Sequence, residues 1–144
     1  MIFTDFKPYH ARKIHLQDDQ KDMESLITIE HALSLETSGP AWAVLSDSGV
    51  VLACGGMATM WAGRAIAWTL LSSNITPREF IAIDRFTRKK IEESGMRRIE
   101  MTVREGHENG IRWAKSLGFK LETPEPMRGF APDGSAHYLF ARVI

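Results

Sequence analysis

The sequence is informative first for what it lacks. It holds one cysteine, Cys54, among 144 residues, so no disulfide can form within the chain. Its 18 basic and 18 acidic side chains leave no net charge, which argues against a broad electrostatic surface for nucleic acid. A chain without disulfides is typical of a reducing compartment, and we therefore expect a soluble, cytoplasmic protein.

Long apolar segments and metal-ligand patterns are also missing. The uncharged run over residues 50–63 is interrupted by glycine and too short to cross a bilayer, and the first residues lack the apolar centre of a signal peptide. The five histidines form no HExxH or His-x-x-x-His pair. We therefore expect neither a membrane segment nor a bound metal ion.

The residue patterns that are present predict one α/β domain over residues 1–144, without repeats or linkers. Apolar runs and alternation predict strands at 2–6, 41–45, 49–57, 65–71, 97–103, 120–127 and 136–144. Amphipathic segments predict helices at 9–16, 18–36, 77–94 and 107–119. In the helix at 18–36 we expect Met23, Leu26, Ile27 and Leu33 to face the core.

The junction LLSSNITPREFIAIDRF, Leu70 to Phe86, reads as a strand end, a polar loop and a helix start. Helix N-termini bind phosphate groups through free backbone N–H groups, yet no glycine lies between Ser72 and Ser94. Thr76-Pro-Arg-Glu79 is a capping box, in which the helix satisfies its own first N–H groups. The sequence leaves two readings open here, a phosphate site and an ordinary capped helix.

A resemblance emerges near the C-terminal end of the chain. The run GIRWAKSLGF, ending at Phe119, places a glycine-terminated short helix before the sixth strand, and the order of elements is β-α-α-β-β-β-α-β-α-β-β. In both respects the chain resembles the GCN5-related N-acetyltransferase superfamily. The resemblance implies a mixed, mostly antiparallel central sheet with helices on both faces. Within that superfamily, the run is most similar to small phage-encoded members of the internal virion protein type.

The resemblance implies an acyl-CoA ligand, acetyl-CoA as co-substrate, and an amine on a small molecule or a protein as acceptor. Backbone at Leu70, Leu71 and Ser72 would hold the pantetheine arm. The pyrophosphate would lie at Ser73, Asn74, Thr76 and Arg78. The family's glycines are absent from this loop, and Pro77 and Glu79 oppose a bound dianion.

Catalytic residues are less clearly marked. The resemblance places a tyrosine that protonates the departing CoA thiolate at position 114, where this chain has alanine. His107 and Glu100 are the candidates for proton transfer, and the alternative for His107 is a solvated histidine at a helix start. Cys54 lies in an apolar strand and is interpreted as a buried, inert thiol. Trp61, in a turn, is expected to be exposed.

Three functions fit this sequence. The first is an acetyl-CoA-dependent N-acetyltransferase with a degenerate pyrophosphate loop. The second is a non-catalytic protein of the same fold, a phage structural or interaction protein with virion components as partners, found in the host cytoplasm or the virion. The third is a binding module for another small anionic ligand.

Overall fold

The structure is a computed structural model that describes residues 1–144 and divides into two compact units. The first unit holds residues 1–59 and 67–94, and the second holds residues 60–66 and 95–144. The seven strands run in the order β1-β2-β3-β4-β5-β7-β6. Strand β4 pairs in parallel with β5, whereas the pairings of β1 with β2, β2 with β3, and β7 with β5 and β6 are antiparallel. The expected α/β fold with a mixed, mostly antiparallel sheet is confirmed.

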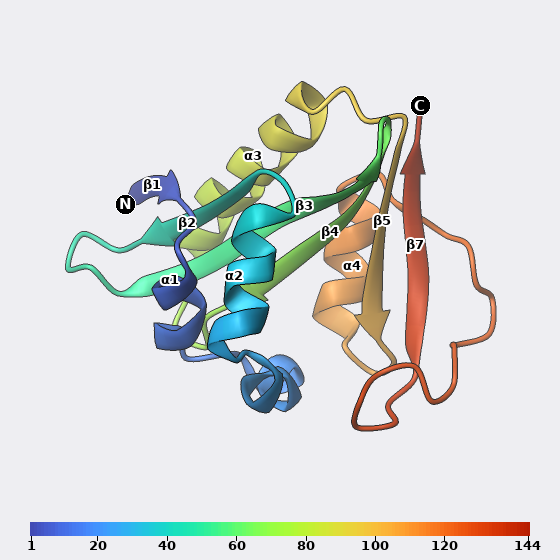
Figure 1. Ribbon diagram of the computed structural model, residues 1–144, viewed down its shortest axis with the longest axis horizontal. Coiled ribbons are helices and arrows are strands. Elements are labelled where there is room, and N and C mark those ends of the chain that lie inside the picture. The colour runs from blue at the N-terminus through green and yellow to red at the C-terminus, as the bar shows by residue number, and fades with distance from the viewer. The chain divides into compact units, whose positions relative to one another are not determined.

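The first unit contains the N-terminal strands, three α-helices and one 3-10 helix. Its elements are β1 (Ile2–Asp5), α1 (Pro8–Lys13), the 3-10 helix η1 (Asp18–Leu26), α2 (Ile29–Thr37), β2 (Ala41–Leu45), most of β3 (Val51–Trp61), the end of β4 (Arg64–Leu71) and α3 (Pro77–Glu93). Helices α1 and α2 cover one face of β2 and β3, and α3 covers the other (Figure 1). Helices therefore lie on both faces of the sheet in this unit.

Strand alternation divides the apolar side chains of the first unit between two layers. Phe6, Ala11, Ile14, Ala43 and Cys54 belong to one buried cluster beneath α1 and α2. On the opposite face, the Phe86 ring of α3 packs edge-on against Trp42, with ring centroids 5.9 Å apart. Each helix layer is thus held by its own apolar core.

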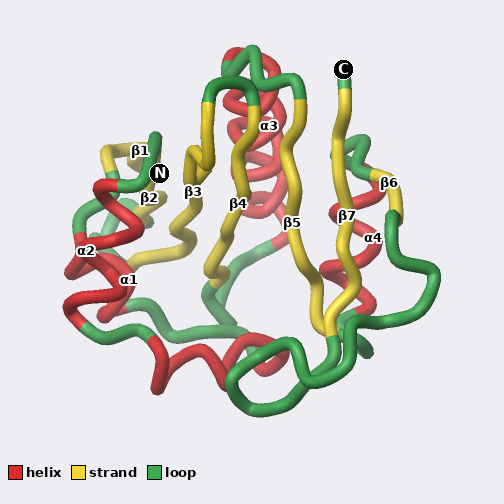
Figure 2. The backbone as a smooth tube through the Cα atoms, turned by 45° about the vertical axis from the view of Figure 1, so that its right-hand side comes forward, coloured by secondary structure: helices red, strands yellow, loops and turns green.

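The second unit contains the start of β4, β5 (Arg98–Arg104), α4 (Glu108–Ser116), the short β6 (Lys120–Leu121) and β7 (His137–Val143). Strands β5 and β7 lie side by side, and β6 lies beyond β7 (Figure 2). None of the helices in the chain is both long and apolar enough to span a bilayer.

Two expected elements differ from those found. The helix expected at 18–36 is broken into η1 and α2, because Thr28 begins a new helix by accepting a hydrogen bond from the His31 N–H. Leu33 is consequently exposed, and Ala32 is buried in its place. The strand expected at 120–127 is ordered as a strand only at Lys120–Leu121, since Pro124 and Pro126 remove two ladder donors.

His10 provides a pH test of the first unit. Its ring is buried, and its Nδ1 accepts a hydrogen bond from the Lys7 N–H at 2.9 Å. Burial, and then the charges of Lys13 and Lys7, lower the pKa of His10 below 6.5. The unfolded chain therefore binds this proton more readily, and we expect stability to fall as pH drops below about 6.5.

The expected result is a smaller loss of stability below pH 6.5 in His10→Gln, measured by urea unfolding across pH 5 to 8. Glutamine keeps an acceptor for the Lys7 N–H, as in a capping box, but does not titrate. The exposed His15 supplies the matched control, His15→Gln, which should leave the pH profile unchanged. An unaltered profile in His10→Gln would contradict the assignment.

Candidate functional site

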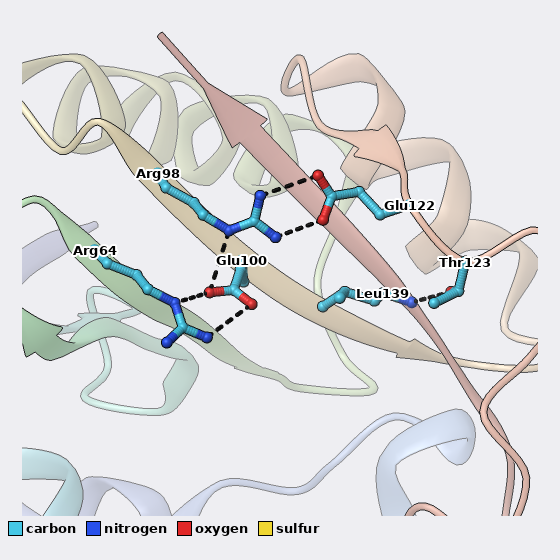
Figure 3. Close-up of polar contacts among 6 residues, drawn as sticks. All are labelled: Arg64, Arg98, Glu100, Glu122, Thr123 and Leu139. Carbon is cyan, nitrogen blue, oxygen red and sulfur yellow. Dashed lines mark hydrogen bonds and ion pairs between the residues drawn. The ribbon is translucent and has the colours of Figure 1, made fainter.

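Glu100 lies at the centre of an ion-pair chain in the second unit (Figure 3). Alternation along β5 directs its side chain to the same face as Arg98, and parallel pairing with β4 brings Arg64 to that face as well. Arg64 donates to both carboxylate oxygens of Glu100 through Nε and Nη2. The Glu100 side chain is 10% exposed, so the pair is largely shielded from water.

A second arginine extends this chain. Arg98 Nε lies 3.4 Å from Glu100 Oε2, and the Arg98 guanidinium also forms a bidentate pair with Glu122. Hydrogen bonds from Arg64, and then from Arg98, lower the pKa of Glu100 below its ordinary value. A carboxylate held this way is a weaker base than a free one. Glu100 stays a candidate for proton transfer, but its contacts are those of a structural ion pair.

Sequence reasoning identified Glu100 without its two arginine partners. Arg98 could have been found from the sequence, because residues at i and i+2 on a strand, such as Arg98 and Glu100, share a face. Arg64 could not be assigned because the parallel β4–β5 register is set by tertiary structure. Trp61 is 57% exposed, as expected, and lies against the Arg64 guanidinium, 4.6 Å from its ring centroid.

His107 begins α4 in the second unit at the end of β5. The expectation of a helix-start position is confirmed, but the alternative of a solvated side chain is wrong, because His107 is only 8% exposed. Its side chain makes no N-cap hydrogen bond, unlike the usual N-cap residue. The imidazole is instead directed inward over the first turn of α4.

Gly110 explains how the His107 ring fits there. A Cβ atom on Gly110 would lie 2.5 Å from His107 Cδ2 and 2.7 Å from Nε2. Any side chain at this position would therefore displace the imidazole. One turn further on, Ala114 is fully buried, and its methyl group has no proton to donate.

The candidate pantetheine segment at the end of β4 lies in the first unit. Leu70 and Ser72 are buried, and Leu71 is half-buried. The Leu71 C=O accepts from the Gln17 N–H at 2.9 Å, and the Leu71 N–H donates to the Gln20 side chain at 2.9 Å. The backbone that would hold a ligand here already has partners within the protein.

The following loop is similarly satisfied. The Ser72 N–H donates to Leu52 O at 2.9 Å, and the Ser73 N–H donates to His15 O at 2.8 Å. The Asn74 N–H donates to the Ser72 hydroxyl at 3.1 Å. These three N–H groups are therefore unavailable to a phosphate in this conformation.

The helix start has formed the expected capping box. The Glu79 N–H donates to Thr76 Oγ1 at 3.2 Å, and the Thr76 N–H donates to Glu79 Oε1 at 2.9 Å. Pro77 has no N–H group to offer. Arg78 is exposed, so its guanidinium is the group here best able to contact a phosphate. A pyrophosphate could therefore be bound here by the Arg78 side chain, but not by the backbone N–H groups of the loop.

The prediction for Cys54 also has a structural outcome. Cys54 is buried, and burial alone raises the pKa of its thiol to about 12, which confirms an inert thiol. No group of three or more His, Cys, Asp or Glu side chains is placed to hold a metal ion.

Comparison with solved structures identifies the fold. Ard1 from Thermoplasma volcanium has a TM-score of 0.79 at 16% identity, covering 99% of this chain and 97% of that one. The ribosomal-protein-alanine N-acetyltransferase from Brucella melitensis has a TM-score of 0.75 at 9% identity over 100% of both chains. The phosphinothricin acetyltransferase (Pat) from Sinorhizobium meliloti, in complex with AcCoA, has a TM-score of 0.71 at 13% identity over 99% and 88%.

The second and third of these neighbours are acetyltransferases, the third of the GNAT (GCN5-related) superfamily, and the chain shares their fold. They give no support to the narrower likeness to phage internal virion proteins. No protein-family model and no curated protein sequence matches the chain.

Proposed function

We propose that this chain is an acetyl-CoA-dependent N-acetyltransferase that acts on an amine of a small molecule or a protein. The observation that carries the proposal is its fold, which matches an N-acetyltransferase along the whole length of both chains. One such neighbour is in complex with AcCoA. Because a fold alone does not determine function, the proposal also requires residues that can bind the ligand and move a proton.

In this proposal the backbone at Leu70 to Ser72 holds the pantetheine arm, and Ser73, Asn74, Thr76 and Arg78 surround the pyrophosphate. The amine nitrogen bonds to the acetyl carbonyl carbon, the carbon–sulfur bond breaks, and the amine proton leaves as the CoA thiolate is protonated. His107 is the better candidate for this proton transfer, because Glu100 is held as an anion by two arginines.

A second function is favoured by a different observation. The capping box at Thr76 and Glu79 takes up the N–H groups that would bind a pyrophosphate, and Ala114 stands where the family has its tyrosine acid. The fold is therefore present without two of its usual functional features. A non-catalytic interaction protein of this fold, with phage virion components as partners, would need neither feature. Ligand binding separates the two functions.

The deciding experiment measures acetyl-CoA binding to the purified protein, both by titration calorimetry and by the shift in Tm on thermal unfolding. Ligand at 100 times its Kd adds about 2.7 kcal/mol of stability, which is several degrees in Tm for a domain of this size. Release of free CoA in the presence of peptide or small-molecule amines then tests turnover. No change in Tm at millimolar acetyl-CoA would overturn the acetyltransferase proposal and leave the non-catalytic protein and the binding module for another anionic ligand.

Arg78 is expected to contribute to that binding. Arg78→Ala should weaken acetyl-CoA affinity about fivefold at low salt, because an exposed charge-assisted contact with a phosphate contributes about 1 kcal/mol. Arg85, exposed on the same helix, gives the matched control Arg85→Ala, which should change affinity little. Equal losses in both variants would mean that only the general charge of the helix matters.

Glu79 should act in the opposite direction. Glu79→Gln keeps the acceptor that completes the capping box but removes a negative charge next to the proposed pyrophosphate. We expect acetyl-CoA to bind a few-fold more tightly to this variant at low salt, and the difference to shrink at high salt as charges are screened. Isothermal titration at two salt concentrations measures both effects.

A further inference from the structure

One edge of β4 in the first unit is covered by the chain segment His15–Gln20. The Ser72 N–H donates to Leu52 O of β3, so Ser72 directs its hydrogen-bonding groups toward β3. Because these groups alternate along a strand, Thr69 and Leu71 direct theirs away from β3. We call this second side, from Thr69 to Ser73, the outer edge of β4.

The segment pairs with the outer edge through backbone and side chain. The Gln17 N–H donates to Leu71 O at 2.9 Å, and the Ser73 N–H donates to His15 O at 2.8 Å. Leu16 and Ser72 form an isolated antiparallel bridge. A short piece of extended chain therefore closes the very end of the strand.

Gln20 continues this pairing with its side chain alone. Its Nε2 donates to Thr69 O at 2.8 Å, and its Oε1 accepts from the Leu71 N–H at 2.9 Å. One donor and one acceptor thus meet two successive outward-facing residues of a strand, as the backbone of a neighbouring strand would. The primary amide of Gln20 thus imitates the N–H and C=O groups of one residue of a neighbouring strand.

The element that carries Gln20 is held weakly. Helix η1 has no buried residue along its nine positions, and 3-10 helices longer than four residues are uncommon. Few buried apolar contacts and partly exposed hydrogen bonds are the marks of a segment that opens at low free energy. The two bonds of Gln20 can therefore be exchanged without unfolding the core.

We propose that Gln20 occupies the place of a ligand amide on the outer edge of β4 and controls access to it. The inference rests on the proposed function. The ligand class is an extended chain with secondary amides, and the pantetheine arm of acetyl-CoA contains two such amides. On binding, the N–H of one of them and the C=O of the other replace Gln20 at Thr69 O and the Leu71 N–H. Gln20 thereby lowers the apparent affinity for acetyl-CoA by competing for the same two backbone groups.

The test is acetyl-CoA binding to Gln20→Met, which keeps the side-chain length but has no amide, and to Gln20→Ala. With the competing bonds removed, both variants should bind acetyl-CoA up to about tenfold more tightly than the unaltered chain. Ser25, exposed on the same helix, gives the control Ser25→Ala, which should bind as the unaltered chain does. Hydrogen exchange in the ligand-free protein should show faster exchange of the Leu71 amide in the Gln20 variants.

The outcomes separate this inference from the proposed function. Tighter binding by the Gln20 variants alone supports the inference. Unchanged or weaker binding by those variants, while the unaltered chain binds acetyl-CoA, overturns the inference and leaves the acetyltransferase proposal in place. Absence of binding by the unaltered chain and by every variant overturns both. An unchanged exchange rate at Leu71 also contradicts the inference, because it would mean that Gln20 does not protect this amide.

Discussion

Replacing Glu100 with glutamine is expected to destabilise the protein by about 2 kcal/mol while leaving acetyl transfer nearly intact. The substitution leaves Arg64 and Arg98 close together without the carboxylate that joins them. Removing one partner of a fully buried ion pair costs about 3–5 kcal/mol, and the loss here is smaller because both arginines are roughly a quarter exposed. Urea unfolding measures the change in stability.

The control for Glu100→Gln is Glu122→Gln, at the outer end of the same ion-pair chain. Glu122 is 37% exposed, and we expect a loss below about 1 kcal/mol. The pH dependence gives a second check. The pKa of Glu100 is lowered by folding, so its contribution is complete above about pH 4.5 and is lost as pH falls through the folded pKa. Glu100→Gln should remove that part of the acid-induced loss.

The same variant tests whether Glu100 is catalytic. If Glu100 accepted the proton of the amine, Glu100→Gln would lower kcat by about 100-fold or more. A structural ion pair predicts lower stability with kcat close to that of the unaltered enzyme. A large fall in kcat with unchanged stability would therefore contradict our assignment of Glu100.

The order of elements was predictable because it depends on local patterns. Capping at Thr76 and Glu79, the glycine ends of α3 and α4, and the apolar runs of β2 and β4 are all encoded within a few residues. The break between η1 and α2 was not predicted. Both segments have apolar residues at helical spacing, and only tertiary packing buries Ala32 in place of Leu33.

The candidate site was harder to predict because its contacts join distant parts of the sequence. Arg64 and Glu100 are 36 residues apart, and Gln20 lies 51 residues from Leu71. No local pattern marks a glutamine that will bind a strand edge. The missing glycines of the loop were visible in the sequence, but their consequence was not. The N–H groups of Ser72 and Ser73 donate to β3 and to the segment at His15, and only that of Asn74 bonds within the loop.

His107 differs from Glu100 in a way that favours a chemical role. Glu100 is fixed as an anion by two arginines. His107 is a buried imidazole whose ring fits only because residue 110 has no side chain. Glycine within a helix costs about 1 kcal/mol relative to alanine. At Gly110 the reason is steric, since a Cβ atom would lie 2.7 Å from His107 Nε2. The first turn of α4 thus gives up stability to accommodate this ring.

Replacing His107 with alanine is expected to lower kcat about 100-fold with little change in the KM for acetyl-CoA, as for loss of a general acid–base group. Gly110→Ala should also lower kcat, because its methyl group displaces the imidazole. The sharpest expectation concerns the double variant. Once His107 is alanine, Gly110→Ala has no ring to displace, so it should leave kcat unchanged; it should also cost less stability than Gly110→Ala alone, because only the close contact with Val103 Cγ1 at 3.0 Å remains.

Steady-state kinetics and urea unfolding of the two single variants and the double variant complete this cycle. Asn109, exposed in the same turn of α4, gives the matched control Asn109→Ala, which should leave kcat unchanged. If Gly110→Ala lowered kcat by the same factor with and without the imidazole, its effect would not pass through His107. Because the cycle compares kcat and stability in the same four proteins, it separates a positioned imidazole from one that only fills space.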